Sequence, residues 1–325
     1  ALSSAASDVY KRQALYQGET RDQILTATLD RATGYNNMIV NGGIVRNRGI
    51  EIEANATPFR NKNGWTWRLF GTYSANENTV MELTDDLFAL QLQNTLSGRG
   101  SMEARVGQSM SAIYGTGYKR APDGQIVYGE DGYPLLANDL IYLGDSNPKG
   151  KGSFGTEIKY KGISLNILFD GQFGGKGYSF TNAMLMEHGK HEKTLPGRYN
   201  GIIGNGVIEN PDGTYRKNDV VANEIWTYYT RHSGRENLEG SMFNTDFLKL
   251  RELTLSYSFP ARICKKIGMR KLSIGVYGRD LFMITNWPAF DPEFGTLNNG
   301  AIDKGFEIAQ FPATRNFGVK LNIEF

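Results

Sequence analysis

The last ten residues of the chain, N-F-G-V-K-L-N-I-E-F, alternate strictly between two kinds of side chain. Phe317 and every second residue after it are apolar, whereas Asn316 and every second residue after it are polar or glycine. This period of two predicts a β-strand with one apolar and one polar face. A tilted strand of about ten residues spans a bilayer in a closed barrel, with its apolar face on lipid and its polar face in a wet lumen. A strand of a soluble sandwich has the same pattern, so the rest of the chain must decide between them.

Seven further segments carry strand signals, most of them of the same kind. The clearest is 163–173, in which Ile167 and its period-two neighbours are mostly apolar, whereas Asn166, Asp170 and Gln172 face the other way. The eight predicted strands are Thr20–Leu29, Gly49–Thr57, Trp65–Ser74, Ser153–Tyr160, Ile163–Phe173, Phe247–Phe259, Lys271–Phe282 and Asn316–Phe325.

The connections between these strands alternate in length from the second strand onward. Short turns are expected at 58–64, 161–162 and 260–270, and Pro58 is expected to end its strand because proline has no N–H for the ladder. Long inserts occupy 75–152, 174–245 and 283–313. Transmembrane barrels have short periplasmic turns and long outer loops. If the C-terminus lies in the periplasm, counting the strands backwards places all three short turns on the periplasmic side and all three long inserts outside. The sequence therefore predicts an all-β chain of about eight antiparallel strands that belong to a transmembrane β-barrel with long extracellular loops.

Composition agrees with a barrel and excludes several other classes. The chain has 325 residues, and its 36 basic and 34 acidic residues give a net charge of +2, which predicts no nucleic-acid partner. Its 39 glycines and its 17 tyrosines and 17 phenylalanines suit a turn-rich protein with aromatic girdles, such as Trp65 and Trp67. The single cysteine, Cys264, excludes an internal disulfide framework, and no apolar run is long enough for a transmembrane helix. An exported barrel needs a signal peptide, so the chain is expected to begin downstream of its natural start.

The first thirteen residues, A-L-S-S-A-A-S-D-V-Y-K-R-Q, show no period. The run S-A-A-S-D-V-Y-K-R-Q resembles translated sequencing-adapter sequence, and the alternative is a disordered tail. In both cases we expect 1–13 to stand outside the fold and 14–325 to form the barrel part.

Three blocks of sequence resemble one family. They are N-G-G-I-V-R-N-R-G-I-E-I-E at 41–53, L-K-L-R-E-L-T-L-S-Y-S-F-P at 248–260, and G-R-D-L-F at 278–282 followed by D-P-E at Asp291, Pro292 and Glu293. These blocks are similar to those of SusC/RagA-type TonB-linked outer-membrane transporters, in which the third block usually reads N-L-F where this chain has Asp280. The family barrel has 22 strands around an N-terminal plug. The resemblance implies that this chain supplies about the last eight strands, without the plug, the TonB box or the first part of the barrel.

The resemblance also implies a function. Members of that family take up glycan or peptide fragments through the lumen in the outer membrane of Gram-negative bacteria. Uptake is driven by TonB, with a SusD-like surface lipoprotein as partner, and the resemblance does not specify the substrate. Two alternatives stay open: a passive or adhesive outer-membrane barrel, and a soluble carbohydrate-binding β-domain or enzyme.

Catalytic and metal-binding chemistry finds little support in the sequence. With three histidines and scattered acids, no nucleophilic triad or carboxylate pair can be argued, so we expect no enzyme, no cofactor and no metal site. The G-G-K run at 174–176 lacks the other positions of a phosphate-binding loop. The acids Asp123, Glu130, Asp131 and Asp139 could surround a calcium ion, but D-G turns explain two of them, and the question stays open.

Two hypotheses concern aromatic side chains. Five tyrosines fall in the first long insert, namely Tyr114, Tyr118, Tyr128, Tyr133 and Tyr142. Sugar rings stack on aromatic faces, so these are candidate ligand contacts; the alternative is that they pack the loop on itself. The terminal Phe325 resembles the assembly signal of outer-membrane barrels, and the alternative is that it is one more residue of an aromatic girdle.

Overall fold

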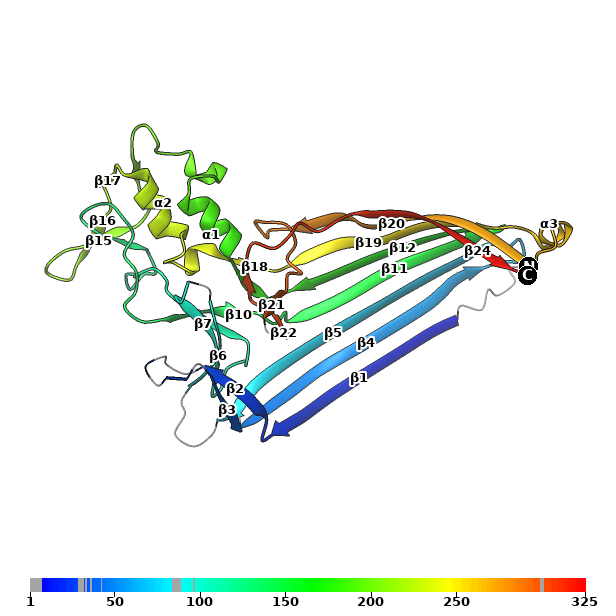
Figure 1. The fold of residues 1–325 in the computed structure, drawn as a ribbon, viewed down its shortest axis with the longest axis horizontal. Helices are drawn as coiled ribbons and strands as arrows, with labels where there is room; N and C mark the ends of the chain where they lie inside the picture. The colour runs from blue at the N-terminus through cyan, green and yellow to red at the C-terminus, as the bar shows by residue number, and fades with distance from the viewer. Residues whose placement is uncertain are drawn as a thin grey trace.

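Eight long strands form one continuous antiparallel sheet (Figure 1). The structure is a computed structural model, and it describes residues 8–28, 32, 34–35, 37–41, 43–83, 89–95, 97–298 and 301–325. In sheet order, the strands are β1 Asp8–Arg21, β4 Ile44–Arg60, β5 Thr66–Glu82, β11 Gly150–Tyr160, β12 Ile163–Phe173, β19 Phe247–Ser258, β20 Lys271–Thr285 and β24 Asn316–Glu324. Sheet order follows chain order, as in an up-and-down barrel wall. The predicted all-β class and the number of long strands are confirmed.

The pairing register gives the sheet one apolar and one polar face. On one face Ile167 lies opposite Leu253, and Val276 lies opposite Val319. On the other face Asn166 lies opposite Thr254. Because partners directly opposite each other point to the same side, the alternation in each strand becomes a face that extends across the sheet.

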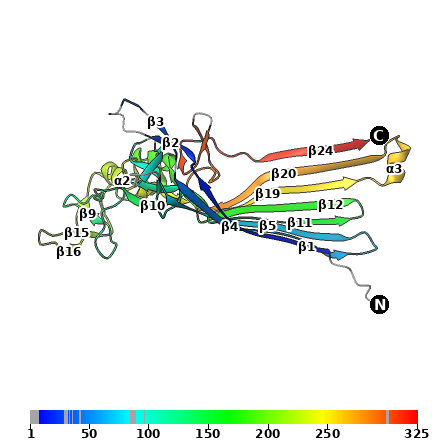
Figure 2. The same ribbon diagram turned by 90° about the horizontal axis from the view of Figure 1, so that it is seen from below.

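The short and long connections lie at opposite ends of the sheet, as predicted. The short connections, one of which holds helix α3 Ala261–Lys266, are at the end where the C-terminus lies (Figures 1 and 2). We call this the turn end and the opposite one the loop end. The long connections leave from the loop end and carry the remaining elements.

The prediction for the first strand is wrong. A strand was expected at Thr20–Leu29, but β1 spans Asp8–Arg21, and a separate hairpin pairs β2 Ile24–Thr28 with β3 Asn37–Asn41. Residues 8–13, expected to stand outside the fold, pair with β4, whereas residues 1–7 lie outside the described part. The reason is that the edge of β4 offers unpaired backbone groups, and a neighbouring segment can satisfy them whatever its side-chain pattern.

Several predicted ends are also corrected. Strand β4 does not stop at Pro58 but continues to Arg60, because a bulge between Ala56 and Phe59 takes the proline out of the ladder. Strand β5 runs eight residues past the predicted Ser74 to Glu82, and β20 runs to Thr285. The expected turn at 260–270 contains α3.

The three long loops fold together at the loop end into a cap, which we define as the described residues of 83–149, 174–246 and 286–315 (Figure 1). All three contribute to one buried cluster, in which Ile113 and Leu143 of the first loop meet Tyr178 and Leu238 of the second and Phe306 of the third. The glycines of the predicted D-G turns, at 124 and 132, have positive φ values of 87° and 79°, which confirms those turns.

The elements of the cap are short. A four-stranded sheet has the order β10-β8-β7-β6. Its strands are β6 Ala89–Asn94, β7 Gly100–Arg105, β8 Ala112–Gly115 and β10 Ile141–Asp145. The other elements are β9 Val127–Tyr128, β13 Lys176–Ser179, α1 Phe180–Glu187, η2 Glu192–Thr194, β14 Ile202–Ile203, β15 Val207–Glu209, β16 Tyr215–Lys217, β17 Val221–Ala222, α2 Ile225–Ser233, η3 Glu239–Ser241, β18 Met242–Asn244, β21 Thr296–Asn298, β22 Ala301–Asp303 and β23 Phe306–Glu307. Among the residues that the structure describes, no helix is both long and apolar enough to cross a membrane.

Candidate functional site

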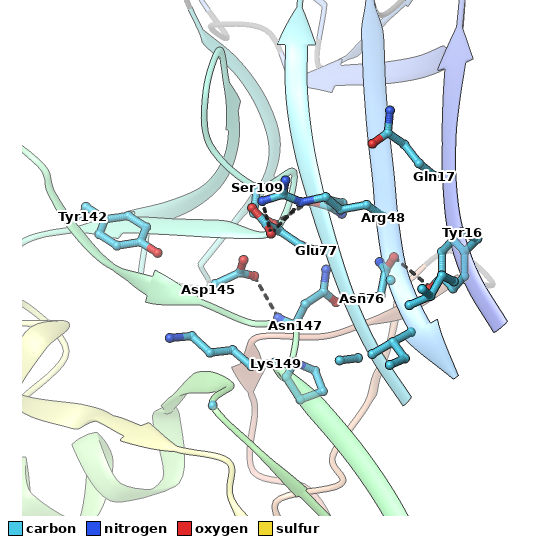
Figure 3. Close-up of a pocket in the computed structure, with 17 residues that line it drawn as sticks. Tyr16, Gln17, Arg48, Asn76, Glu77, Ser109, Tyr142, Asp145, Asn147 and Lys149 are labelled. Carbon is cyan, nitrogen blue, oxygen red and sulfur yellow. Dashed lines mark hydrogen bonds and ion pairs between the residues drawn. The ribbon is translucent and has the colours of Figure 1, made fainter. Parts of the chain in front are cut away.

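One cavity lies where β1, β4 and β5 meet the cap, and we call it the loop-end cavity (Figure 3). Its volume is about 790 Å³. The sheet contributes Leu15, Tyr16, Gln17, Arg48, Gly49, Ile50, Ala75, Asn76, Glu77 and Asn78, and the cap contributes Ser109, Tyr142, Asp145, Asn147, Pro148, Lys149 and Gly174. A cavity of this size with both amide and aromatic groups in its wall can hold part of an oligomeric ligand.

Hydrogen bonds fix much of the cavity wall. The Tyr16 hydroxyl donates to Oδ1 of Asn76 at 3.0 Å. The Ser109 hydroxyl donates to Oδ1 of Asn78 at 2.7 Å, so it ties the first loop to β5. The carboxylate of Asp145 accepts from the backbone N–H of Asn147 at 2.9 Å, which holds the loop in a turn. The wall is therefore preorganised on both its sheet side and its cap side.

Of the five candidate tyrosines, only Tyr142 lines the loop-end cavity. Its side chain is 52% exposed, and its ring makes an edge contact with Tyr114 at a centroid distance of 5.6 Å. Tyr114 itself is buried, beneath the guanidinium of Arg105, which lies 3.7 Å from the ring centroid. Tyr114 thus supports Tyr142 from behind and does not face the cavity.

Two other tyrosines surround a histidine inside the cap. The hydroxyl of Tyr118 lies 3.1 Å from Nδ1 of His232 and donates to the His232 carbonyl at 2.7 Å, and the hydroxyl of Tyr128 lies 3.1 Å from Nε2. A neutral imidazole protonated at Nδ1 satisfies all three contacts, because Nδ1–H donates to Tyr118 and Nε2 accepts from Tyr128. Burial lowers the pKa of His232 to about 4, which favours the same neutral form.

The fifth tyrosine, Tyr133, accepts a hydrogen bond from the backbone N–H of Glu224 at 3.1 Å. Tyr118, Tyr128 and Tyr133 therefore join segments of the cap to one another. The structure does not bring the five rings into one surface. The sequence missed Tyr16 and Asn76 as cavity residues, because a polar residue in a strand looks like any other residue of a wet face.

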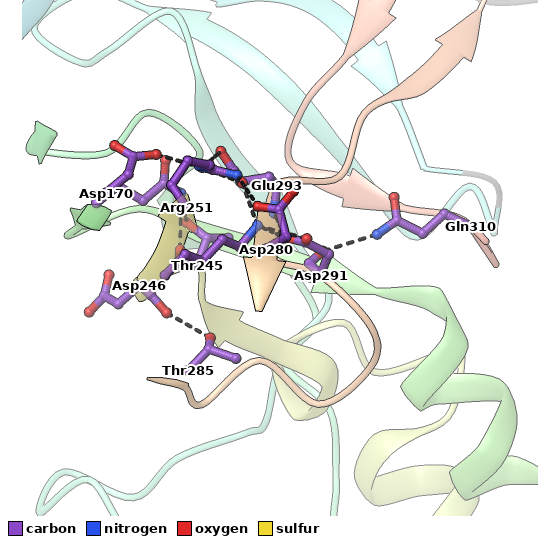
Figure 4. A network of polar contacts seen from close by, with 11 residues as sticks. Asp170, Thr245, Asp246, Arg251, Asp280, Thr285, Asp291, Glu293 and Gln310 are labelled. Carbon is purple, nitrogen blue, oxygen red and sulfur yellow. Dashed lines mark hydrogen bonds and ion pairs between the residues drawn. The ribbon is translucent and has the colours of Figure 1, made fainter. Parts of the chain in front are cut away.

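The D-P-E residues belong to a polar network at the loop end (Figure 4). The ammonium of Lys249, on β19, donates to both carboxylate oxygens of Asp291 at 2.7 Å and also contacts Glu293. The guanidinium of Arg251 pairs with Asp170, with Asp280 at 2.9 Å and with Glu293 at 2.8 Å. Pro292 between the two acids is buried. The network joins the third loop to the wall.

The substitution at Asp280 has a structural explanation. Asp280 lies in a bulge where β19 and β20 lose register, and its φ is 52°. Asn and Asp tolerate this left-handed conformation better than most residues, so either fits the position. An aspartate also supplies a charge to the guanidinium of Arg251.

The remaining predicted residues lie apart from the cavity. Phe325 follows β24 at the turn end, and its side chain is 85% exposed. Asp123 and Asp131 each accept hydrogen bonds from the residues of their own turns. Within the described part of the chain, no three His, Cys, Asp or Glu side chains are grouped to hold a metal ion.

Comparison with known proteins finds similar sequences among TonB-dependent receptors. The chain is 25% identical over 335 residues to the TonB-dependent receptor P3 of Formosa agariphila, and 23% identical over 357 residues to the receptor P39 of that organism. Each alignment covers 95% of this chain but only 32% and 33% of the relatives, so the chain spans about a third of their length. No family model matches the sequence.

Solved structures give the same result. The chain superposes on the RagAB peptide transporter with a TM-score of 0.70 at 16% identity, over 98% of this chain and 33% of that one. The closed-closed state of the RagAB peptide importer gives 0.70 at 17% identity, with the same coverage. The resemblance to SusC/RagA-type transporters is thereby confirmed, and the eight-stranded sheet has the fold of a portion of their barrel. The polar face then corresponds to the lumen, and the apolar face to the lipid side.

Proposed function

We propose that this chain forms the C-terminal part of the barrel wall of an outer-membrane transporter that imports oligosaccharide or peptide fragments in a TonB-driven cycle. The observation that carries the proposal is the loop-end cavity, which lies where β1, β4 and β5 meet the cap and has Tyr16 and Asn76 of the polar face in its wall. The similarity to proteins named TonB-dependent receptors supports active transport, and it agrees with a protein that is not an enzyme.

The apolar face has the features of a lipid-facing wall. Near the turn end Trp65 stacks on Tyr160, with centroids 4.2 Å apart, and near the loop end Tyr73 stacks on Phe173 at 6.5 Å. Eight residues separate Trp65 from Tyr73 in sequence, and at about 3.3 Å per residue these two girdles are roughly 26 Å apart along the strand. An apolar band about 25 Å tall between aromatic girdles is typical of outer-membrane barrels.

The loop-end cavity supplies contacts suited to an oligomer. Tyr142 presents a ring on which a sugar or a peptide side chain can stack. The side-chain amides of Asn76 and Asn147 can both donate and accept hydrogen bonds, as sugar hydroxyls and peptide groups require. The ligand role proposed for the five tyrosines therefore concentrates on Tyr142, with Tyr114 behind it.

The second loop of the cap exposes large hydrophobic side chains that are suited to contact with a partner protein. Leu195, Tyr199, Ile203 and Trp226 are exposed large hydrophobic side chains in the second loop, and Tyr199 is 98% exposed. Exposed aromatic and aliphatic groups on one segment are typical of a protein interface. We assign this surface to the SusD-like lipoprotein.

The test is uptake by the bacterium that carries the gene. Cells are given fluorescent oligosaccharide and peptide mixtures, with and without deletion of the gene and with and without a protonophore. Active import predicts that deletion and protonophore each abolish accumulation of at least one mixture. A passive barrel predicts loss on deletion but persistence with the protonophore, an adhesin predicts no change in uptake, and recovery of the protein in the soluble fraction would end the proposal.

A further inference from the structure

A second cavity, of about 540 Å³, lies beside the first and shares Pro148 with it. We call it the lysine pocket, because Lys151, Lys176 and Lys304 are among its lining residues. Lys151 is on β11 opposite Gln172, on the polar face of the sheet, whereas Lys176 and Lys304 come from the second and third loops. Three separate parts of the chain thus bring positive charge to one place at the mouth of the lumen.

The charges of these three lysines are not neutralised by direct pairing. All three are exposed, and none has an ammonium nitrogen within 4.0 Å of a carboxylate oxygen in the part of the chain that the structure describes. Lys249, a short way off on β19, shows the contrast: it is 3% exposed and bound by two carboxylates. The lysines of the pocket are therefore available to a ligand.

Glycines hold the stems of two lysines at this site. At Gly144, whose φ is +141°, an added Cβ would lie 2.9 Å from Cγ and Cδ of Lys176. At Gly174, with φ +84°, it would lie 2.8 Å from Cβ and Cγ of Lys149, which lines the neighbouring loop-end cavity. Each lysine stem thus lies flat against backbone that has no side chain. Of these two lysines, Lys176 lines the lysine pocket, and its stem is packed against the backbone of Gly144.

One carboxylate faces the pocket, that of Glu293. Its oxygens already accept from Lys249 and Arg251. The network around these cations holds four carboxylates, of Asp170, Asp280, Asp291 and Glu293, against two cations, a net charge of −2. Its attraction for the lysines acts over a longer distance and through water, where screening weakens it. The alternative explanation is that the three lysines offset the net negative charge of this network. The experiment must separate this role from the binding of a ligand.

We infer that the lysine pocket binds a negatively charged group of the imported oligomer, a carboxylate or a sulfate, while the rest of the oligomer occupies the loop-end cavity. This inference rests on the proposed import function and adds to it a substrate class, acidic oligomers. Ammonium groups recognise such oxyanions as point charges, without the fixed geometry that a guanidinium imposes. The pocket therefore suits either an acidic sugar or an acidic peptide side chain.

The test uses the complete transporter from its natural gene, purified in detergent, and four fluorescent probes. Oligogalacturonate is paired with a neutral malto-oligosaccharide, and hexaglutamate with hexaglutamine, and binding is measured by anisotropy. The variant replaces Lys151, Lys176 and Lys304 with Gln. The control replaces Lys190, Lys193 and Lys217 with Gln, which removes the same charge from exposed cap positions that line neither cavity.

The inference predicts that one acidic probe binds at least 10-fold more tightly than its neutral counterpart, and which pair shows this identifies sugar or peptide. The preference should fall with added salt, disappear in the pocket variant and persist in the control. Equal binding of acidic and neutral probes, or a preference that survives in the pocket variant, would overturn it. A pocket variant that keeps its acidic preference but melts at a lower temperature would assign the lysines to the carboxylate network. If gene deletion abolishes uptake but acidic and neutral oligomers are taken up equally well, the import function is supported and the inference about the lysine pocket is rejected.

Discussion

The ammonium group of Lys249 lies 2.7 Å from both carboxylate oxygens of Asp291, a residue 42 positions further along the chain. Lys249 belongs to the barrel wall and Asp291 to the third loop, so one buried charge fastens the loop to the sheet. Such a pair contributes little net stability compared with apolar residues, because both charges lose their hydration. Removing one partner is costly, however, because it leaves the other charge buried and unpaired.

Replacing Lys249 with Met should therefore release the third loop. The expected loss is roughly 3–5 kcal/mol, the usual cost of a broken buried pair, and it should appear as faster proteolysis within 286–315 in the assembled transporter. The matched control is Arg48→Met, which breaks the exposed pair with Glu77 and should cost less than about 1 kcal/mol. Equal protection of the loop in both variants would show that the third loop is held by other contacts.

Two adjacent residues of β12 should respond in opposite ways to arginine. Ile167 lies on the apolar face opposite Leu253, so Ile167→Arg should impair assembly, by roughly 2–4 kcal/mol for a lipid-facing arginine near the midplane. Asn166 faces Glu157 and Thr254, so Asn166→Arg should fold normally in the complete barrel. Membrane levels of the heat-modifiable barrel compare the two, and equal levels would mean that the faces are assigned the wrong way.

Protonation of His232 should weaken the cap. Burial lowers its pKa from 6.5 to about 4, so between these values the unfolded chain binds a proton and the folded cap does not. The contribution of neutral His232 to the free energy of unfolding is thus fully present above about pH 6.5. It decreases as the pH drops towards 4, by at most roughly 3 kcal/mol. Hydrogen exchange of 225–233 at pH 7 and pH 5 measures the effect. His232→Phe should flatten the pH dependence, whereas His188→Gln, at an exposed position, should leave it as it is.

The sequence predicted the strands whose two faces meet different surroundings. Strand β12 has the predicted bounds, and β24 differs by one residue, because apolar and polar positions alternate along most of both strands. The bulge at Asp280 was not predicted, because a residue that drops out of the ladder leaves no mark on a period of two until the register is known.

The cap and the cavities could not be predicted in this way. Tyr178, Leu238 and Phe306 meet in one buried cluster although 60 or more residues separate each from the next. No local period reports such contacts, since each loop supplies only part of the core. Tyr142 was named as a candidate because aromatic residues are conspicuous in a loop, and it lines a cavity; its ligand role stays a prediction. Lys151 and Lys304 were not, because a lysine on a wet face or in a loop is ordinary until its neighbours are placed beside it.

The register of β1 bears on the origin of the first thirteen residues. Lys11 lies opposite Ala54 and Gln13 opposite Ile52, so both polar side chains stand on the otherwise apolar face. We keep the hypothesis that 1–13 are not natural sequence, and it predicts that resequencing the genomic locus will give apolar residues at positions 11 and 13. Finding Lys11 and Gln13 encoded in the genome would reject it and would make β1 an unusual lipid-facing strand.

The last prediction concerns Phe325, which stands in series with Phe317 on the apolar side of the final strand. Both rings are largely exposed, so burial within this chain does not distinguish them. If the terminal aromatic is an assembly signal, Phe325→Asp or deletion of Phe325 should strongly reduce membrane insertion of the complete transporter, whereas the barrels that do insert should keep near-normal stability. Phe317→Asp is the control, since it changes the same strand and face away from the terminus. If Phe325 is only a girdle residue, insertion should be nearly normal and the folded barrel should be weaker by about 1–2 kcal/mol. Normal insertion of the deletion variant would therefore refute the signal, because a recognition element cannot be removed without a change in recognition.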